Sequence, residues 1–595
     1  MSKPASVYTK RIRQFEEQSK SVKKQLFVSS MLRLALFLLT CLMVYFLWGA
    51  IQGVLLTILL FFILFFTLVK RHVNLQALYR QLEALIQINK TELSVLNGNF
   101  SHLPDGSAFI DSGHPFSQDV DLFGPDSFFQ YLNRTALEQG KKALANMLTQ
   151  NQTQDIVHKQ DAIKELSEAL EFRQYFSASA MLSTSPQDTT ASTPLDLLET
   201  LDNHRPFTPP KTILLASLFS GISGLIILLY FVDLMPISAL VIWLFIGIGI
   251  TGLYAKRVNA LSGKVDTLQK TFQSYHKLVH LLENLSLSSA LMCQLQSRIQ
   301  VKEKKASIIL KDFSRAIDAL DQRNNLLFGF LGNGFLLWDL RQSYKLENWL
   351  KMYLASAKEW FKVLATVDAY NSLGNFAFNH PDYIFPSITQ NNTLIKATQA
   401  VHPLIPASEA VTNDYTIERG EFFIITGANM AGKSTFLRTV SLQIIMSNTG
   451  LPVRAASCQY TPIKLITSMR TADSLAKEAS YFYAELARLK FIIDRLQAHE
   501  YFIVLDEILK GTNSKDKALG SQKFLEKLVS SQSSGIIATH DLSLCKVAQE
   551  TDRVKNYYFD AQIIDNELYF DYKFKSGICQ NMNASFLLKK MQIID

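Results

Sequence analysis

The segment Ile424–Leu437 reads IITGANMAGKSTFL and contains the pattern G-x-x-x-x-G-K-[ST] from Gly427 to Ser434. Apolar, β-prone residues precede the pattern and an amphipathic stretch follows it, so the segment predicts a strand, a phosphate-binding loop and a helix. Gly427 and Gly432 permit tight turns that aim backbone N–H groups at phosphate oxygens, and the helix adds the positive end of its dipole. We therefore expect ATP to bind along the loop residues Gly427, Ala428, Asn429, Met430, Ala431, Gly432, Lys433, Ser434 and Thr435.

Two further apolar runs complete the expected site. Tyr501–Glu507 reads YFIVLDE and is typical of a buried parallel strand, at whose carboxyl end ligands collect. Asp506 and the Ser434 hydroxyl would hold Mg²⁺, while Lys433 would reach the β- and γ-phosphates. Glu507 would orient and deprotonate the attacking water. The alternative for this run is a core strand that ends in an acidic turn. A third run ends in His540, which could sense the γ-phosphate.

Length and composition restrict the class of protein only broadly. The 595 residues are enough for several domains, and the formal net charge of +8 does not by itself indicate a nucleic-acid-binding protein. The five cysteines show no C-x-x-C pairing, so neither a disulfide framework nor a zinc site is expected.

Two apolar blocks predict membrane-spanning hairpins. Residues 34–69 contain no charged side chain and suit two spans of about 20 residues, joined by a tight turn at residues 48–53. Residues 212–254 form a second block, interrupted by Asp233 and Pro236. Because a charge at the bilayer centre costs about 2.5–3.5 kcal/mol, Asp233 is better placed in a turn between two spans. A buried helical hairpin of a soluble protein is the alternative for this second block.

Basic residues predict the orientation of both hairpins. They flank the outer ends of the two apolar blocks, whereas the two short turns contain no Lys or Arg. The flanking basic residues are Arg11, Arg13, Lys20, Lys23, Lys24, Lys70, Arg71, Lys211, Lys256 and Arg257. The positive-inside rule then predicts a four-span membrane protein whose termini and ATPase domain are cytoplasmic. No small-residue cleavage site follows the first block, so we expect no removable signal peptide.

A long helix with heptad spacing is predicted after the second hairpin. Its apolar residues recur in steps of three and four, at Val258, Leu261, Val265, Leu268, Phe272, Tyr275, Val279 and Leu282. Such a seam packs either inside its own domain or between subunits.

The C-terminal motifs resemble those of the MutS family of DNA mismatch-repair proteins. The loop at residues 426–435 is similar to the family's phosphate loop and includes its Asn-Met pair, and residues 505–512 and 538–540 resemble its Mg²⁺-binding strand and switch histidine. Residues 473–485 resemble the segment that reaches the partner subunit's nucleotide, with Ser480 in the contacting position and Glu478 where glycine is usual. Residues 121–135 resemble the start of the helical core.

The resemblance implies an ATPase that forms a composite homodimer and binds mismatched or branched DNA. It covers roughly residues 110–200 and 300–595, and the family's N-terminal mismatch-reading and connector domains have no room before residue 110. We therefore predict a membrane-anchored MutS-like ATPase. An ATP-switched tether that binds a protein and an ATP-driven transporter are the alternatives, although the transporter signature Leu-Ser-Gly-Gly-Gln is absent.

The predicted fold is multidomain, with transmembrane hairpins, an all-α core with a long lever-like helix, and a C-terminal α/β phosphate-loop domain. The expected segments are a basic N-terminus (1–25), hairpin 1 (26–72), the first part of the helical core (73–210), hairpin 2 (211–255), the heptad helix (256–300), the second part of the core (301–390) and the ATPase domain (391–595).

Overall fold

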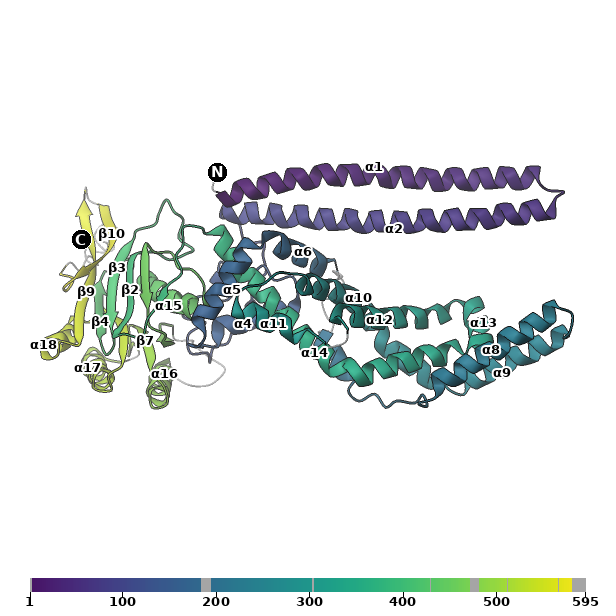
Figure 1. The fold of residues 1–595 in the computed structure, drawn as a ribbon. Coiled ribbons are helices and arrows are strands. Elements are labelled where there is room, and N and C mark those ends of the chain that lie inside the picture. Colours follow the sequence, from purple (N-terminus) through teal and green to yellow (C-terminus); the bar gives the residue numbers. More distant parts are fainter. Residues whose placement is uncertain are drawn as a thin grey trace.

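The computed structural model of this chain describes residues 3–182, 194–301, 304–428, 430–470, 481–510, 512–564 and 567–580. The C-terminal α/β domain lies at one end, and two helical arms extend from a central helical core toward the other end (Figure 1). The expected order of a mostly helical N-terminal part followed by an α/β part is confirmed.

The first arm is an antiparallel pair of long helices, α1 (Lys3–Phe46) and α2 (Ile51–Leu96). Near the core the two helices pack through Phe15, Val22 and Leu85, and there Tyr8 donates a hydrogen bond of 2.8 Å to Asn379. Toward the tip the apolar side chains face outward. The expected boundaries of the segments 1–25 and 26–72 thus fall inside helices, since α1 continues past residue 25 and α2 past residue 72.

The second arm ends in the hairpin of α8 (Thr212–Phe231) and α9 (Ile237–Gly252). The rings of Phe219 and Trp243 stack at 4.6 Å between the two helices, and Trp243 donates a hydrogen bond of 2.8 Å to Ser223. The tips of both hairpins point to the same end of the molecule (Figure 1). By length and composition α1, α2 and α8 could each cross a membrane, and α9 with the start of α10, bent by 62°, could supply a fourth span.

Shorter helices build the core between the arms and the α/β domain. They are α3 (Phe128–Leu132), α4 (Glu138–Thr149), α5 (Ile156–Glu168), α6 (Leu170–Met181), α7 (Pro194–Thr200), α11 (Ala290–Arg298), α12 (Ala306–Asp321) and α13 (Leu326–Leu336), with short 3₁₀ turns at Ser107–Phe109 and Gln322–Asn324. The long helix α14 (Trp338–Asn379) runs the length of this core and contacts α4, α5 and α12.

The heptad seam packs inside the chain. It lies on α10 (Ala255–Glu283), and all of its apolar residues are buried against α12 and α14. Phe272, for example, contacts the rings of Phe313 and Phe361. This decides the choice between intramolecular and intersubunit packing. The helix ends at Glu283 rather than near residue 300, and a break precedes α11.

A buried carboxylate joins α14 to the start of α4. Asp368 accepts backbone hydrogen bonds from Ala136 (3.0 Å) and Leu137 (2.8 Å), and Gly140 leaves room for it, since a Cβ there would lie 2.1 Å from the Asp368 carboxylate. Burial raises the pKa of Asp368 to about 7, although the two N–H donors act in the opposite direction.

We expect the Asp368 carboxyl to make stability depend on pH. Its folded-state pKa lies above the unfolded value near 3.9, so the folded protein binds more protons between these values, and the free energy of unfolding falls as pH rises from about 4 to about 7. Asp368→Asn should flatten this slope, which thermal unfolding of the purified protein at pH 5 and pH 8 would measure. Asp382→Asn, at an exposed aspartate, is the control. An unchanged slope in Asp368→Asn would contradict the assignment.

The C-terminal domain contains two sheets. The smaller has the strand order β1 (Ser387–Ile388), β5 (Ser457–Tyr460), β2 (Thr393–Ala400), β3 (Asn413–Glu418). The larger has the order β10 (Glu567–Ser576), β9 (Val554–Ile564), β4 (Phe422–Gly427), β8 (Ser534–Ala538), β7 (Tyr501–Asp506), β6 (Lys464–Ser468), and only the β9–β10 pair is antiparallel. Its helices are α15 (Lys433–Thr449), α16 (Tyr481–Leu496), α17 (Ser514–Ser530) and α18 (Val547–Glu550), with a 3₁₀ turn at Leu542–Lys546.

Polar contacts hold the α/β domain against the helical core. Asp121 pairs with Arg438 at 3.2 Å and with Arg470 at 2.6 Å, and Asn151 exchanges two hydrogen bonds with the backbone of Leu465 in β6. Because Arg438 lies on α15, directly after the 427–434 loop, the core is in contact with the helix that follows that loop.

Candidate functional site

The site lies at the carboxyl ends of three adjacent parallel strands. β4 is hydrogen-bonded to β8 and β8 to β7, so the residues that follow these strands meet at one edge of the sheet. The predicted loop, the two carboxylates and His540 therefore lie together, because they follow the strands at residues 424–427, 501–506 and 535–538. Parallel sheets bind ligands at this edge.

The 427–434 loop turns sharply between β4 and α15. Gly427, Met430 and Gly432 have φ values of 146°, 67° and 103°, in the region that favours glycine. A Cβ on Gly427 would lie 2.5 Å from the Phe559 carbonyl oxygen, so a larger residue would force the loop away from β9. Inside the loop the Lys433 ammonium donates to the carbonyls of Gly427 (2.8 Å) and Ala428 (2.9 Å), and burial lowers its pKa.

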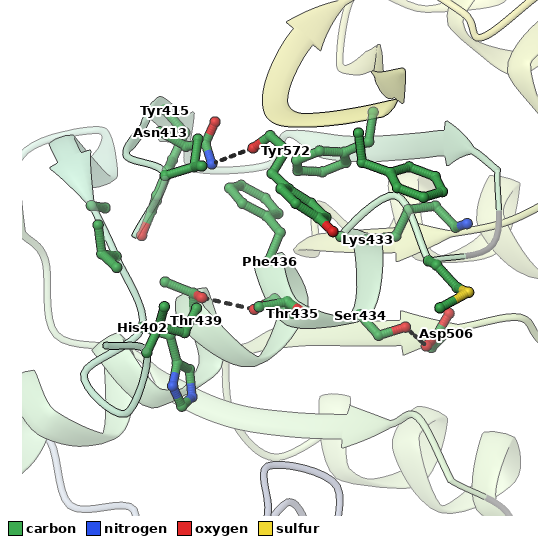
Figure 2. Close-up of a pocket in the computed structure, with 18 of the residues that line it drawn as sticks. His402, Asn413, Tyr415, Lys433, Ser434, Thr435, Phe436, Thr439, Asp506 and Tyr572 are labelled. Carbon is green, nitrogen blue, oxygen red and sulfur yellow. Dashed lines mark hydrogen bonds between the residues drawn. The ribbon is translucent and has the colours of Figure 1, made fainter. Parts of the chain in front are cut away.

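Ser434 and Asp506 are joined directly. The Ser434 hydroxyl at the start of α15 donates a hydrogen bond of 2.8 Å to the carboxylate of Asp506 at the end of β7 (Figure 2). Both side chains offer oxygen ligands, the type that Mg²⁺ prefers, and both face the cavity described below. The residues present therefore fit the metal that the sequence predicts.

Glu507 and His540 form a second pair. The His540 Nε2 lies 2.8 Å from the Glu507 carboxylate and 3.5 Å from the Lys433 ammonium. The hydrogen bond from His540 lowers the pKa of Glu507 to about 2, so Glu507 is ionised throughout the neutral range. His540 thus contacts the predicted base, a partner that the strand-end position alone did not indicate.

These residues line a cavity of about 960 Å³ between the two sheets. Its walls contain Lys433, Ser434, Asp506, Glu507 and His540 from the sheet edge. The rest of the lining includes His402, Ile405, Asn413, Phe570 and Tyr572. A pocket of this size accommodates a nucleotide.

Tyr572 was missed by sequence reasoning. It lies in β10 with its ring beside the loop, since a Cβ on Gly432 would lie 3.1 Å from the ring (Figure 2). Asn413 holds this segment by donating a hydrogen bond of 3.1 Å to the Tyr572 carbonyl. The sequence left open whether Tyr415 stacks on the base or packs in the core; it is buried and donates a hydrogen bond to Gln443 on α15. The stretch from Tyr572 to Gly577 resembles part of the MutS family's C-terminal tail, but that resemblance gave the Tyr572 side chain no role in the site.

Two predicted ligand residues, Asn429 and Ser480, lie outside the described residues, as does Glu478. Thr435 and Met430 line the cavity, and Ala431 is a fully buried residue of the loop.

Residues 423–591 match the family model of MutS domain V. This part of the chain is similar to MutS domain V. Curated relatives include MutS protein homolog 4 of Homo sapiens, 28% identical over 233 residues, which are 38% of this chain and 25% of the relative. The DNA mismatch repair protein MutS of Clostridium botulinum is 28% identical over 237 residues, with the same coverage, and that of Staphylococcus haemolyticus is 26% identical over 268 residues, 44% of this chain and 30% of the relative.

The chain spans about a quarter of the length of the curated relatives it matches. The match includes every described residue of the site from Gly427 to His540, whereas the helices from α1 to α13 lie before it. The likeness therefore concerns the α/β domain.

Proposed function

We propose that this protein binds and hydrolyses ATP with Mg²⁺ at the 427–434 loop. The observation that carries the proposal is the joint placement of Lys433, the Ser434–Asp506 pair and the Glu507–His540 pair on one wall of a nucleotide-sized cavity. A bound Mg²⁺ would neutralise phosphate charge.

Each residue has a distinct role in this proposal. Lys433 and the N-terminus of α15 bind phosphate oxygens, and Ser434 and Asp506 hold the metal. The ionised Glu507 accepts the proton of the attacking water, and His540 holds the Glu507 carboxylate in position through their hydrogen bond. Tyr572 and His402 border the part of the cavity away from the carboxylates and would contact the nucleoside.

We further propose that the protein is anchored in a membrane by the two hairpins. Their outer surfaces expose many large apolar side chains, such as Phe37, Leu59, Leu218 and Phe245, each more than half exposed. Exposed apolar patches of this extent are unusual for a soluble surface. Because both tips point the same way, a single bilayer would accommodate them with the α/β domain on one side (Figure 1).

The proposed substrate of the ATP-driven cycle is mismatched or branched DNA, bound by a homodimer of the nucleotide domains. Support comes from the mismatch-repair names of the relatives and from the resemblance of the loop. The test is the ATPase rate of detergent-solubilised protein without DNA and with homoduplex, mismatched and branched DNA. We expect one DNA form to raise the rate. A rate indifferent to every DNA would overturn the DNA part of the proposal and leave the ATPase part standing.

A further inference from the structure

The helix α13 (Leu326–Leu336) is a short apolar helix of the second arm, with the sequence LLFGFLGNGFL. The sequence predicted it as part of the helical core at 301–390. In the structure it instead contacts both helices of the second hairpin, α8 and α9, before the chain enters α14. Its surroundings are therefore those of the hairpin.

Glycines allow α13 and α9 to approach closely. A Cβ on Gly247 in α9 would lie 2.2 Å from the carbonyl oxygen of Gly334, and a Cβ on Gly334 would lie 2.2 Å from the Leu244 side chain. Small residues at a helix–helix contact are typical of packing in membranes, where backbones approach without a hydrophobic driving force. Gly249, two residues along α9, has open space around it.

The first turns of α13 carry exposed apolar side chains. They are Leu326, Leu327, Phe330 and Leu331, and Leu326 and Leu327 are 89% and 69% exposed. Phe330 meets the exposed Phe245 of α9 edge to face at 6.4 Å between ring centroids. The apolar surface of the hairpin thus continues onto α13 without interruption.

Basic side chains border this surface at the ends of the hairpin nearest the core. Lys211 precedes α8, Lys256 and Arg257 begin α10 directly after α9, and Lys345 follows on α14; all four are exposed. Arg323 and Asp339, on either side of α13, pair at 3.4 Å and leave no net charge there. An apolar face with a basic border complements a lipid leaflet with anionic head groups.

We propose that α13 is a third membrane-embedded element, which enters the leaflet on the side of the α/β domain and binds lipid acyl chains without crossing the bilayer. Its 11 residues span about 16 Å, roughly half of a hydrocarbon core of about 30 Å. The inference rests on the proposed membrane anchoring. Since α14 begins directly after α13 and reaches α4 and α5, it would give the ATPase domain a mechanical connection to the bilayer.

The experiment uses the full chain reconstituted in vesicles that contain lipid with a nitroxide on its acyl chain. In a Cys41→Ser, Cys293→Ser background, which removes the exposed thiols, a single fluorophore is attached through Leu327→Cys, Leu218→Cys or Leu519→Cys. Leu218 and Leu519 are similarly exposed, on α8 and on α17 of the α/β domain. We expect the lipid to quench the label at position 327 as strongly as at 218, and not at 519.

The outcomes separate this inference from the membrane anchoring on which it rests. Quenching at 218 without quenching at 327 would overturn the inference and keep the anchoring, whereas quenching at neither position would overturn both.

A matched pair of variants adds a second readout. Gly247→Leu should displace α13 and change the quenching at 327, while Gly249→Leu should leave it unchanged. Equal effects of the two substitutions would contradict the proposed packing.

Discussion

Glu507→Gln should abolish ATP turnover and leave ATP binding intact. Glutamine keeps the size of the side chain and can still bond to His540, but it cannot accept a proton from water. Loss of a general base lowers turnover by about 10²–10⁴-fold. Binding should persist because Lys433, the loop amides and the Ser434–Asp506 pair are untouched. Single-turnover hydrolysis and equilibrium binding of a fluorescent ATP analogue would measure the two effects separately.

Controls for this prediction are available on the same domain. Glu526→Gln changes the same charge on α17, where Glu526 pairs with the exposed Lys523, and should leave the rate unchanged. His540→Ala should lower turnover less than Glu507→Gln does, because the carboxylate stays ionised near neutral pH even without its partner. Wild-type turnover in Glu507→Gln would refute the role of Glu507 as the base, and loss of binding would show that the residue supports the loop instead.

Glu92→Ala should loosen the first hairpin from the helical core. Glu92 on α2 is 2% exposed, pairs with Arg134 at 2.6 Å and accepts a hydrogen bond of 2.8 Å from Asn379 on α14. Removing one partner of a buried pair costs about 3–5 kcal/mol, since the other charge stays buried without compensation. We expect faster hydrogen exchange and proteolysis in the part of α1 and α2 near the core, together with a lower unfolding temperature.

An exposed ion pair of the same hairpin provides the comparison. Glu16 on α1 pairs with Lys90 on α2 at 3.1 Å, with side chains 40% and 53% exposed. Glu16→Ala should cost less than about 1 kcal/mol. The double variant Glu92→Ala, Arg134→Ala should be less destabilised than the sum of the two single variants, because it removes the stranded charge. Equal effects of Glu16→Ala and Glu92→Ala would contradict the importance of burial at this junction.

The sequence predicted local elements of the fold, but not the contacts that join distant parts of the chain. The Gly427–Ser434 spacing predicted a strand, a loop and a helix in that order, and the structure has β4, the loop and α15 there. The heptad residues of α10 were correctly assigned to one helix, but their partners α12 and α14 were left open. The stretch at 326–336 was predicted only as part of the helical core, and an apolar run of 11 residues looks the same in a buried helix and at a membrane.

The sequence by itself determined the local elements of the site and the order of the domains. Glycine spacing, apolar runs and charge-free blocks act over a few neighbouring residues, so they can be read without knowing the fold. Only the tertiary structure decided that His540 bonds to Glu507, that Tyr572 borders the loop, and that α13 packs on α9 through Gly247 and Gly334. These contacts join residues far apart in the chain, and they depend on how strands and helices pack.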